Sequence, residues 1–155
     1  MAKPDPFAAK LLSVLPAMLM LAGCGASGSD PLPPEPVIEL QAVNPSTIVA
    51  LQDSIVFVLA YTDGDGDLGF PEADSAAVYI TDERFPLTER FHLAPLAPEG
   101  AAIAITGVLI VVLPRTIMKD PTAASEQAIF SIRVRDRAGN WSNTEQSGAL
   151  TVLPD

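Results

Sequence analysis

The chain has very little of the residues on which most catalytic and metal centres depend. Its 155 residues include one cysteine and one histidine, Cys24 and His92. One cysteine cannot form an internal disulfide or a thiolate-rich zinc site, and one histidine leaves few nitrogen ligands for a metal. The sequence also lacks a G-x-S-x-G segment and a glycine-rich phosphate loop before a helix. We therefore expect the chain not to be an enzyme.

Positive charge is scarce as well. Nine lysine and arginine residues stand against 19 aspartate and glutamate residues, which gives a net charge of -10. An acidic surface is repelled by phosphate backbones and by anionic lipid headgroups, so nucleic acid is not an expected partner. Hydrophobic residues make up 48% of the chain, which is enough to bury one compact core against the entropy cost of folding.

The N-terminal 23 residues follow the order of a secretory signal. Two lysines precede an apolar run over residues 11–21, and small residues follow it. The run is too short for the roughly 20 residues of a membrane-spanning helix. The segment Leu21-Ala22-Gly23-Cys24 resembles the lipobox of bacterial lipoproteins. The resemblance implies that Cys24 carries the lipid, that it begins the mature chain and, because Gly25 follows it, that the protein reaches the outer membrane.

An ordinary cleaved signal with Cys24 as a buried free thiol is the alternative. Residues 24–36 are rich in glycine and serine and then in proline, a composition typical of a tether that is first flexible and then extended. We expect the folded domain to span residues 37–155. Removal of residues 1–23 takes away two lysines and one aspartate, so the acidity belongs to the exported part of the chain.

Residues 37–155 alternate with the two-residue period of strands. Residues 55–61 alternate between two apolar faces, and residues 130–135 alternate between apolar and polar side chains. Further candidate strands span residues 37–43, 46–51, 76–81, 90–93, 101–113 and 149–153. Seven or eight short strands without crossover helices predict an all-β fold, an antiparallel β-sandwich. A small up-and-down barrel is the alternative.

The segment 101–113 is the most apolar part of this region. At thirteen residues it is too short to span a membrane as a helix, and its β-branched residues favour a strand. We expect a long central strand that bends at Gly107.

A cluster of carboxylates follows the strand at residues 55–61. Asp63, Asp65 and Asp67 alternate with glycines, and three anions at this spacing repel unless a hard cation with oxygen ligands relieves them. The spacing resembles the first half of an EF-hand calcium loop. The resemblance implies that calcium is bound by Asp63, Asp65, Asp67, the carbonyl of Gly69 and Asp74.

The loop also departs from that pattern. Leu68 stands where the EF-hand has a glycine, Asp74 replaces the usual glutamate, and no flanking helices are predicted. A calcium loop between two strands remains the hypothesis. The alternative is a solvated turn in which the Asp-Gly pairs simply supply positive φ angles.

A second loop follows the strand at residues 130–135. Residues 136–143, DRAGNWSN, resemble the D-x-A-G-N-x-S segment near the last hairpin of bacterial immunoglobulin-like repeats. Its Gly-Asn pair suits a tight turn, and Trp141 is large enough to cap the end of a sandwich. Together with the lipobox, the tether and the aspartate loop, this segment resembles bacterial lipoproteins with one immunoglobulin-like β-sandwich domain of about seven strands. The resemblance implies no particular activity.

In an immunoglobulin-like sandwich the two loops are expected at the same end of the domain. Asp136 or Asn140 would then supply a further oxygen to the calcium. Two functions remain open: a membrane-anchored binding or accessory module for an unknown protein or glycan partner, and a purely structural spacer or assembly subunit of the cell envelope without a metal. Exposed rings near the loops, with Phe70 and Trp141 as the leading candidates, favour the binding module.

Overall fold

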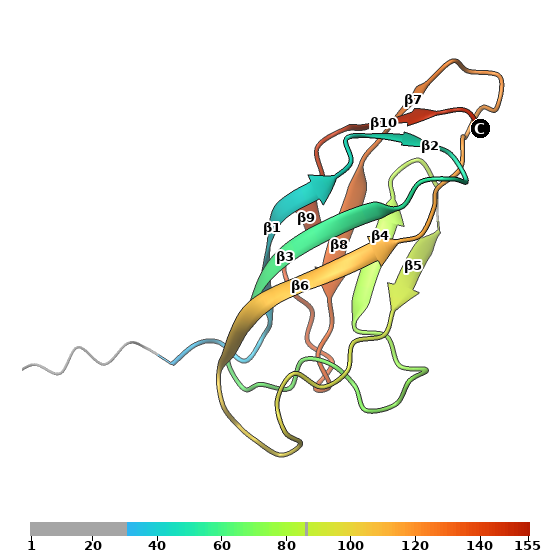
Figure 1. The fold of residues 1–155 in the computed structure, drawn as a ribbon. Coiled ribbons are helices and arrows are strands. Elements are labelled where there is room, and N and C mark those ends of the chain that lie inside the picture. The colour runs from blue at the N-terminus through green and yellow to red at the C-terminus, as the bar shows by residue number, and fades with distance from the viewer. Residues whose placement is uncertain (1–30, 86) are drawn as a thin grey trace, which may run out of the picture.

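The computed structural model describes residues 31–155 except residue 86. This part of the chain contains ten strands (Figure 1). Cys24 and the predicted signal lie outside these residues. In chain order the strands are β1 Val37–Asn44, β2 Thr47–Val49, β3 Ile55–Asp63, β4 Val78–Asp82, β5 Thr88–Phe91, β6 Ile105–Leu113, β7 Glu126–Ala128, β8 Phe130–Val134, β9 Glu145–Gln146 and β10 Leu150–Leu153.

The strands form two facing layers. One layer is the sheet β1-β3-β6, and the other is the sheet β5-β4-β8-β9. A third sheet, β2-β10-β7, lies at one end of the sandwich, where the C-terminus is also found (Figure 1). Strand pairs are antiparallel except β2 and β10, which run parallel. Because each sheet has two different end strands, none of the three closes into a barrel, and the predicted β-sandwich is confirmed.

The core lies between the two layers and follows the predicted alternation. On β3, Ile55, Phe57 and Leu59 are fully buried, while the residues between them are half-buried. Phe57 meets Phe130 of β8 edge to face, with ring centroids 5.7 Å apart. Each fully buried aliphatic or aromatic side chain stabilises the fold by about 1.5–3 kcal/mol. The inward-facing apolar side chains therefore hold the two sheets together.

The prediction for residues 101–113 was partly wrong. Residues 105–113 form β6, but β6 is an end strand of its sheet rather than a central one. No β-bulge interrupts it at Gly107, since its register with β3 runs without a break from Ile105 to Leu113. A Cβ at Gly107 would lie 2.7 Å from the Tyr61 hydroxyl. The glycine thus makes room for the Tyr61 ring on the neighbouring strand.

The outer face of β6 is apolar and exposed. Val108, Ile110 and Val112 are 56%, 69% and 46% exposed, and they pair with the half-buried aliphatic residues on the outer face of β3. Outward-facing valine and isoleucine explain why the segment seemed central from its sequence. Apolar character alone does not distinguish an end strand from a central one.

Two short strands were not predicted. β7 and β9 have three and two residues, and most of these are polar, so they carry no apolar period from which a strand could be recognised. The candidate strand at residues 90–93 also shifts, because the pairing with β4 covers Thr88 to Phe91. Over the part of the chain that the structure describes, no helix is long and apolar enough to cross a membrane.

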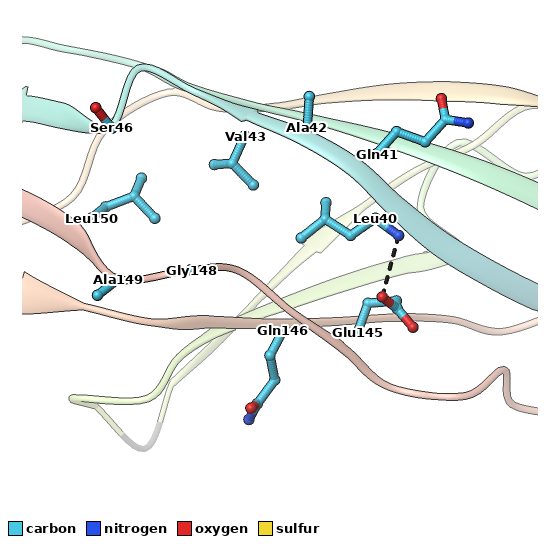
Figure 2. A pocket seen from close by; sticks show the side chains of 10 residues that line it. All are labelled: Leu40, Gln41, Ala42, Val43, Ser46, Glu145, Gln146, Gly148, Ala149 and Leu150. Atoms are coloured by element: carbon cyan, nitrogen blue, oxygen red, sulfur yellow. Dashed lines mark hydrogen bonds between the residues drawn. The ribbon is translucent and has the colours of Figure 1, made fainter.

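The free edge of β1 is covered by side chains rather than by a strand. The Asn143 amide oxygen accepts a hydrogen bond from the Ile38 amide at 2.9 Å, and the Glu145 carboxylate accepts one from the Leu40 amide at 3.3 Å. Figure 2 shows the second bond, beside an open hollow of about 370 Å³ between β1 and residues 145–150. These two side chains occupy backbone donors that would otherwise be free to pair with another strand.

Candidate functional site

The structure gathers the three alternating aspartates at one end of the sandwich. Asp63 is the last residue of β3 and is 0% exposed, while Asp65 and Asp67 are half-buried in the loop that follows. Each offers one carboxylate oxygen, and these oxygens all lie within 4.8 Å of one another. The sequence-based grouping of Asp63, Asp65 and Asp67 is therefore present in the fold.

One oxygen of each aspartate has no partner. The Oδ1 atoms of Asp63, Asp65 and Asp67 are buried and form no hydrogen bond with any residue in the described range, 31–155 without 86. The second oxygens of Asp63 and Asp67 are held by the backbone: the Leu68 amide donates to Asp63 Oδ2 at 2.8 Å, and the Ala138 amide donates to Asp67 Oδ2 at 2.9 Å. Two of the three carboxylates are thus fixed in orientation with a free oxygen each. Buried polar atoms are normally hydrogen-bonded, so three unpartnered carboxylate oxygens in one place require an explanation.

The electrostatics of the cluster disfavour three negative charges. Burial raises the pKa of Asp63 to about 6, and the charges of Asp65 and Asp67 add to the effect, while the hydrogen bond from Leu68 opposes it. Burial also raises the pKa of Asp67, as does the charge of nearby Asp136. A cation among these oxygens would remove the repulsion and the cost of burial together.

The glycines of the loop allow other segments to pack against it. A Cβ at Gly64 would collide with the backbone carbonyl oxygens of Leu32 and Pro33, and a Cβ at Gly66, whose φ is +75°, would collide with that of Ile103. These carbonyls lie next to the loop only because glycine occupies both positions. The sequence pattern did not reveal them, although two glycines between three aspartates were the available sign of a close backbone approach.

The aspartate loop and the 136–143 loop are neighbours, as predicted. Leu68 pairs with Asp136 as an isolated antiparallel bridge. The Arg137 amide donates to the Asp67 carbonyl at 3.3 Å, and the Arg137 guanidinium donates to the Gly69 carbonyl at 2.8 Å. In Figure 1 both loops lie at the end of the sandwich opposite the β2-β10-β7 sheet. The two loops support each other directly.

Asp136 has a different arrangement from the cluster. It is 0% exposed, and both of its carboxylate oxygens accept hydrogen bonds from Asn140, one from the backbone amide at 2.7 Å and one from the side-chain amide at 2.9 Å. Asp136 and Asn140 therefore close the turn between them. Among the acidic residues of the described part of the chain, Asp136 does not join the group of Asp63, Asp65 and Asp67.

Two further residues of the EF-hand resemblance have other surroundings. The Gly69 carbonyl is taken by Arg137, and Asp74 is exposed. The cause is Leu68, which is 0% exposed and packs into the core. Burial of Leu68 draws the chain inward after Asp67, so the loop does not wrap around a centre as an EF-hand loop does.

The two aromatic candidates have different surroundings. Phe70 is half-buried, and its amide donates to the Leu93 carbonyl at 2.8 Å. Trp141 is 37% exposed and pairs with Arg135, with its ring centroid 4.7 Å from that of Tyr79. The expectation that Trp141 caps the end of the sandwich was wrong, because this pairing places the ring on the outer face of the β5-β4-β8-β9 sheet.

The single histidine lies away from the cluster. His92 is exposed, and its Nδ1 lies 3.0 Å from the Ser75 carbonyl oxygen. This backbone contact gives the ring a local structural partner just after β5.

Comparisons with known proteins add little to this geometry. No family model matches the chain, and no curated protein matches it. Among solved structures, the chain is similar to a point mutant of the SrpA adhesin from Streptococcus sanguinis, with 15% sequence identity and a TM-score of 0.40. The match covers 78% of this chain and 57% of the adhesin chain, so this chain spans less than two thirds of that structure. A likeness at this level carries no argument about function.

Proposed function

We propose that this chain is a non-catalytic binding module of the cell envelope, with a loop stabilised by calcium and a lipid anchor on Cys24. The observation that carries the proposal is the set of three buried, unpartnered carboxylate oxygens of Asp63, Asp65 and Asp67. A loop that serves only as a turn gains nothing from burying three unpaired anions, and it loses stability by doing so.

Calcium fits the donor set better than other metals. The donors are all oxygens, which suit hard cations, and no histidine or cysteine lies in the group. Calcium takes six to eight oxygens in flexible geometry, so backbone carbonyls and water can complete its shell. The carbonyls that pack against Gly64 and Gly66 are candidates of this kind. Magnesium is a poorer fit, since it demands nearly octahedral geometry and keeps several waters.

The test is a calcium titration followed by thermal unfolding. We expect a dissociation constant on the order of 10⁻⁴ to 10⁻³ M, as for extracellular modules, and a stabilisation of about 1.4 kcal/mol at ten times that constant. The variant Asp65→Asn should lose the response, and Asp74→Asn, which changes an exposed aspartate of the same loop, should keep it. A wild type that gains no more from millimolar calcium than from sodium chloride of equal ionic strength would contradict the metal site.

Membrane anchoring rests on the sequence of the N-terminal segment. The lipobox-like Leu21-Ala22-Gly23-Cys24 and the proline-rich segment after it support attachment through Cys24, with the outer membrane as the expected location. Metabolic labelling with a fatty-acid analogue should tag the wild type and leave Cys24→Ala unlabelled. Equal labelling of the two would refute the anchor.

A structural spacer is the second candidate function. The half-burial of Phe70, Phe85 and Phe91 favours it, because these rings do not form an exposed aromatic patch at the loops. Trp141, which is exposed together with charged neighbours on an open sheet face, favours binding instead.

A further inference from the structure

One outer sheet face concentrates basic and aromatic side chains on an otherwise acidic chain. Tyr79 of β4 pairs with Arg90 of β5 on one side and with Arg133 of β8 on the other. Arg135 follows Arg133 on the same face and pairs with Trp141. These five residues, the arginine face, contain three of the nine basic residues of the chain.

The aromatic rings hold the guanidinium groups in place. The Arg133 guanidinium carbon lies 3.9 Å from the centre of the Trp141 ring, and that of Arg135 lies 5.7 Å from it. Trp141 in turn packs against Tyr79, whose ring centre is 6.0 Å from the Arg90 guanidinium carbon. An arginine stacked on a ring keeps its N–H groups available at the edge of the guanidinium plane.

In the described part of the chain, these guanidinium groups lack an acidic partner. Within residues 31–155, leaving out residue 86, none of the three forms an ion pair within 4.0 Å or a side-chain hydrogen bond. Arg84, by contrast, contacts Asp82 and Glu126 at 2.6 Å each. The chain has about two acidic residues for each basic one, so random placement would be expected to give these arginines carboxylate neighbours. Their convergence without one leaves a positive surface suited to an external anion.

A hollow lined by hydroxyl groups adjoins the arginines. It has a volume of about 250 Å³ and is lined by Tyr79, Thr81, Glu83, Ser131, Arg133 and Thr144. Two of these hydroxyls already donate within the protein, Tyr79 to the Ala76 carbonyl and Ser131 to the Glu83 carboxylate. Their oxygens and the Glu83 carboxylate are left as acceptors for the hydroxyl groups of a ligand. The face is therefore complementary to a ligand that carries both carboxylates and hydroxyl groups.

We propose that the arginine face binds a polysaccharide of carboxylated sugars. Adjacent strands lie about 4.8 Å apart, so Arg90 and Arg133, two strands apart, are separated by roughly 10 Å. That figure is the spacing of their backbones, and a polymer with repeated carboxylates can contact both arginines while each stays beside its ring. Guanidinium groups bind carboxylates in a bidentate manner. This inference rests on the binding role proposed above and names its ligand class, but it does not depend on calcium.

The test is binding of full-length protein to oligogalacturonate, a chain of carboxylated sugars, measured by isothermal titration calorimetry. We expect Arg133→Gln to weaken binding about tenfold, as the loss of a charged hydrogen bond predicts, and Arg133→Lys to weaken it less. Arg90→Gln should also weaken binding, and it does not disturb the stack on Trp141. The control Arg115→Gln changes an exposed arginine elsewhere and should leave affinity within twofold.

Two comparison ligands test the assignment. The methyl-esterified oligosaccharide should bind at least tenfold more weakly, because it has lost its charge. Poly-glutamate of equal charge should also bind more weakly, and equal affinity would overturn the saccharide assignment in favour of an acidic peptide. Binding that is equal for wild type and Arg90→Gln would overturn the site. Repeating the titration in EDTA separates this result from the calcium proposal, since binding retained in EDTA supports the arginine face even if the loop binds no metal.

Discussion

Asp63 and Asp136 are both fully buried carboxylates at the same end of the sandwich, yet their surroundings differ. Asp136 has both oxygens satisfied by Asn140, whereas Asp63 has one oxygen bound to the Leu68 amide and the other without a partner. Burial is equal, so it is the completeness of hydrogen bonding that distinguishes them. A fully satisfied buried carboxylate stabilises its own turn, and an incompletely satisfied one weakens the fold until a ligand arrives.

Removal of the satisfied carboxylate should have the largest effect. Asp136→Ala leaves two donors of Asn140 without acceptors and disturbs the bridge to Leu68. We expect the free energy of unfolding to fall by about 3 kcal/mol. Urea unfolding in EDTA measures the loss, with Asp74→Ala as an exposed control. A loss no larger than that of the control would show that the turn forms without Asp136.

Neutralisation of Asp63 should instead raise the free energy of unfolding of the metal-free protein. Asp63→Asn keeps an oxygen for the Leu68 amide and removes one of three repelling charges. At pH 7 in EDTA we expect the variant to be more stable than the wild type by on the order of 1–2 kcal/mol. Its calcium response should disappear. Calorimetry of both proteins with and without calcium tests this reversal, and a variant that is less stable than the wild type in EDTA would contradict it.

The pH dependence of the metal-free protein should sharpen the same comparison. The pKa of Asp63 is about 6 in the folded protein and close to 3.8 when unfolded. The folded state therefore binds the proton more tightly, and stability falls as pH rises between these values. The advantage of Asp63→Asn in EDTA should grow between about pH 4 and pH 6, by up to about 1 kcal/mol per pH unit, and then level off. Urea unfolding at four pH values tests this, and an advantage that grows toward low pH would be incompatible with a raised pKa.

Substitution of a glycine in the aspartate loop should have the smallest effect on stability. A Cβ at Gly64 meets backbone oxygens of residues 32 and 33, whereas a Cβ at Gly148 meets nothing within 4 Å. We expect Gly64→Ala to cost about 0.5 kcal/mol, since residues 31–36 lie outside any strand and can move away, and Gly148→Ala to be neutral or slightly stabilising. Urea unfolding of the pair measures the difference. Equal stability of the two variants would mean that residues 32–33 do not pack on the loop in solution.

The sequence predicted the sandwich because inward-facing residues such as Phe57 and Phe130 recur with a strict two-residue period. It did not predict β7 and β9, which are held by their neighbours rather than by an apolar pattern of their own. It also misplaced β6, since an exposed apolar face and a buried one have the same composition.

For the candidate site, local spacing was sufficient to group Asp63, Asp65 and Asp67, because residues so close in the chain cannot separate far. The roles of Gly69 and Asp74 depend on where Leu68 is buried, which is a property of the folded core. The arginine face could not be predicted from the sequence for a similar reason. Arg90 and Arg133 are distant in the chain and meet only through the pairing of β5 and β8 with β4.

The packing of Leu32 and Pro33 on Gly64 links the aspartate loop to the segment that leads into β1. If Cys24 carries the proposed lipid anchor, this contact fixes the point at which the chain coming from the anchor meets the sandwich. If the metal-free loop loosens and releases residues 32–36, five more residues can extend between the anchor and the sandwich. The greatest distance between the two then grows by about 15 Å, at 3.1 Å per residue. Bound calcium would then hold the sandwich close to its anchor, and loss of calcium would let the sandwich extend farther from the membrane.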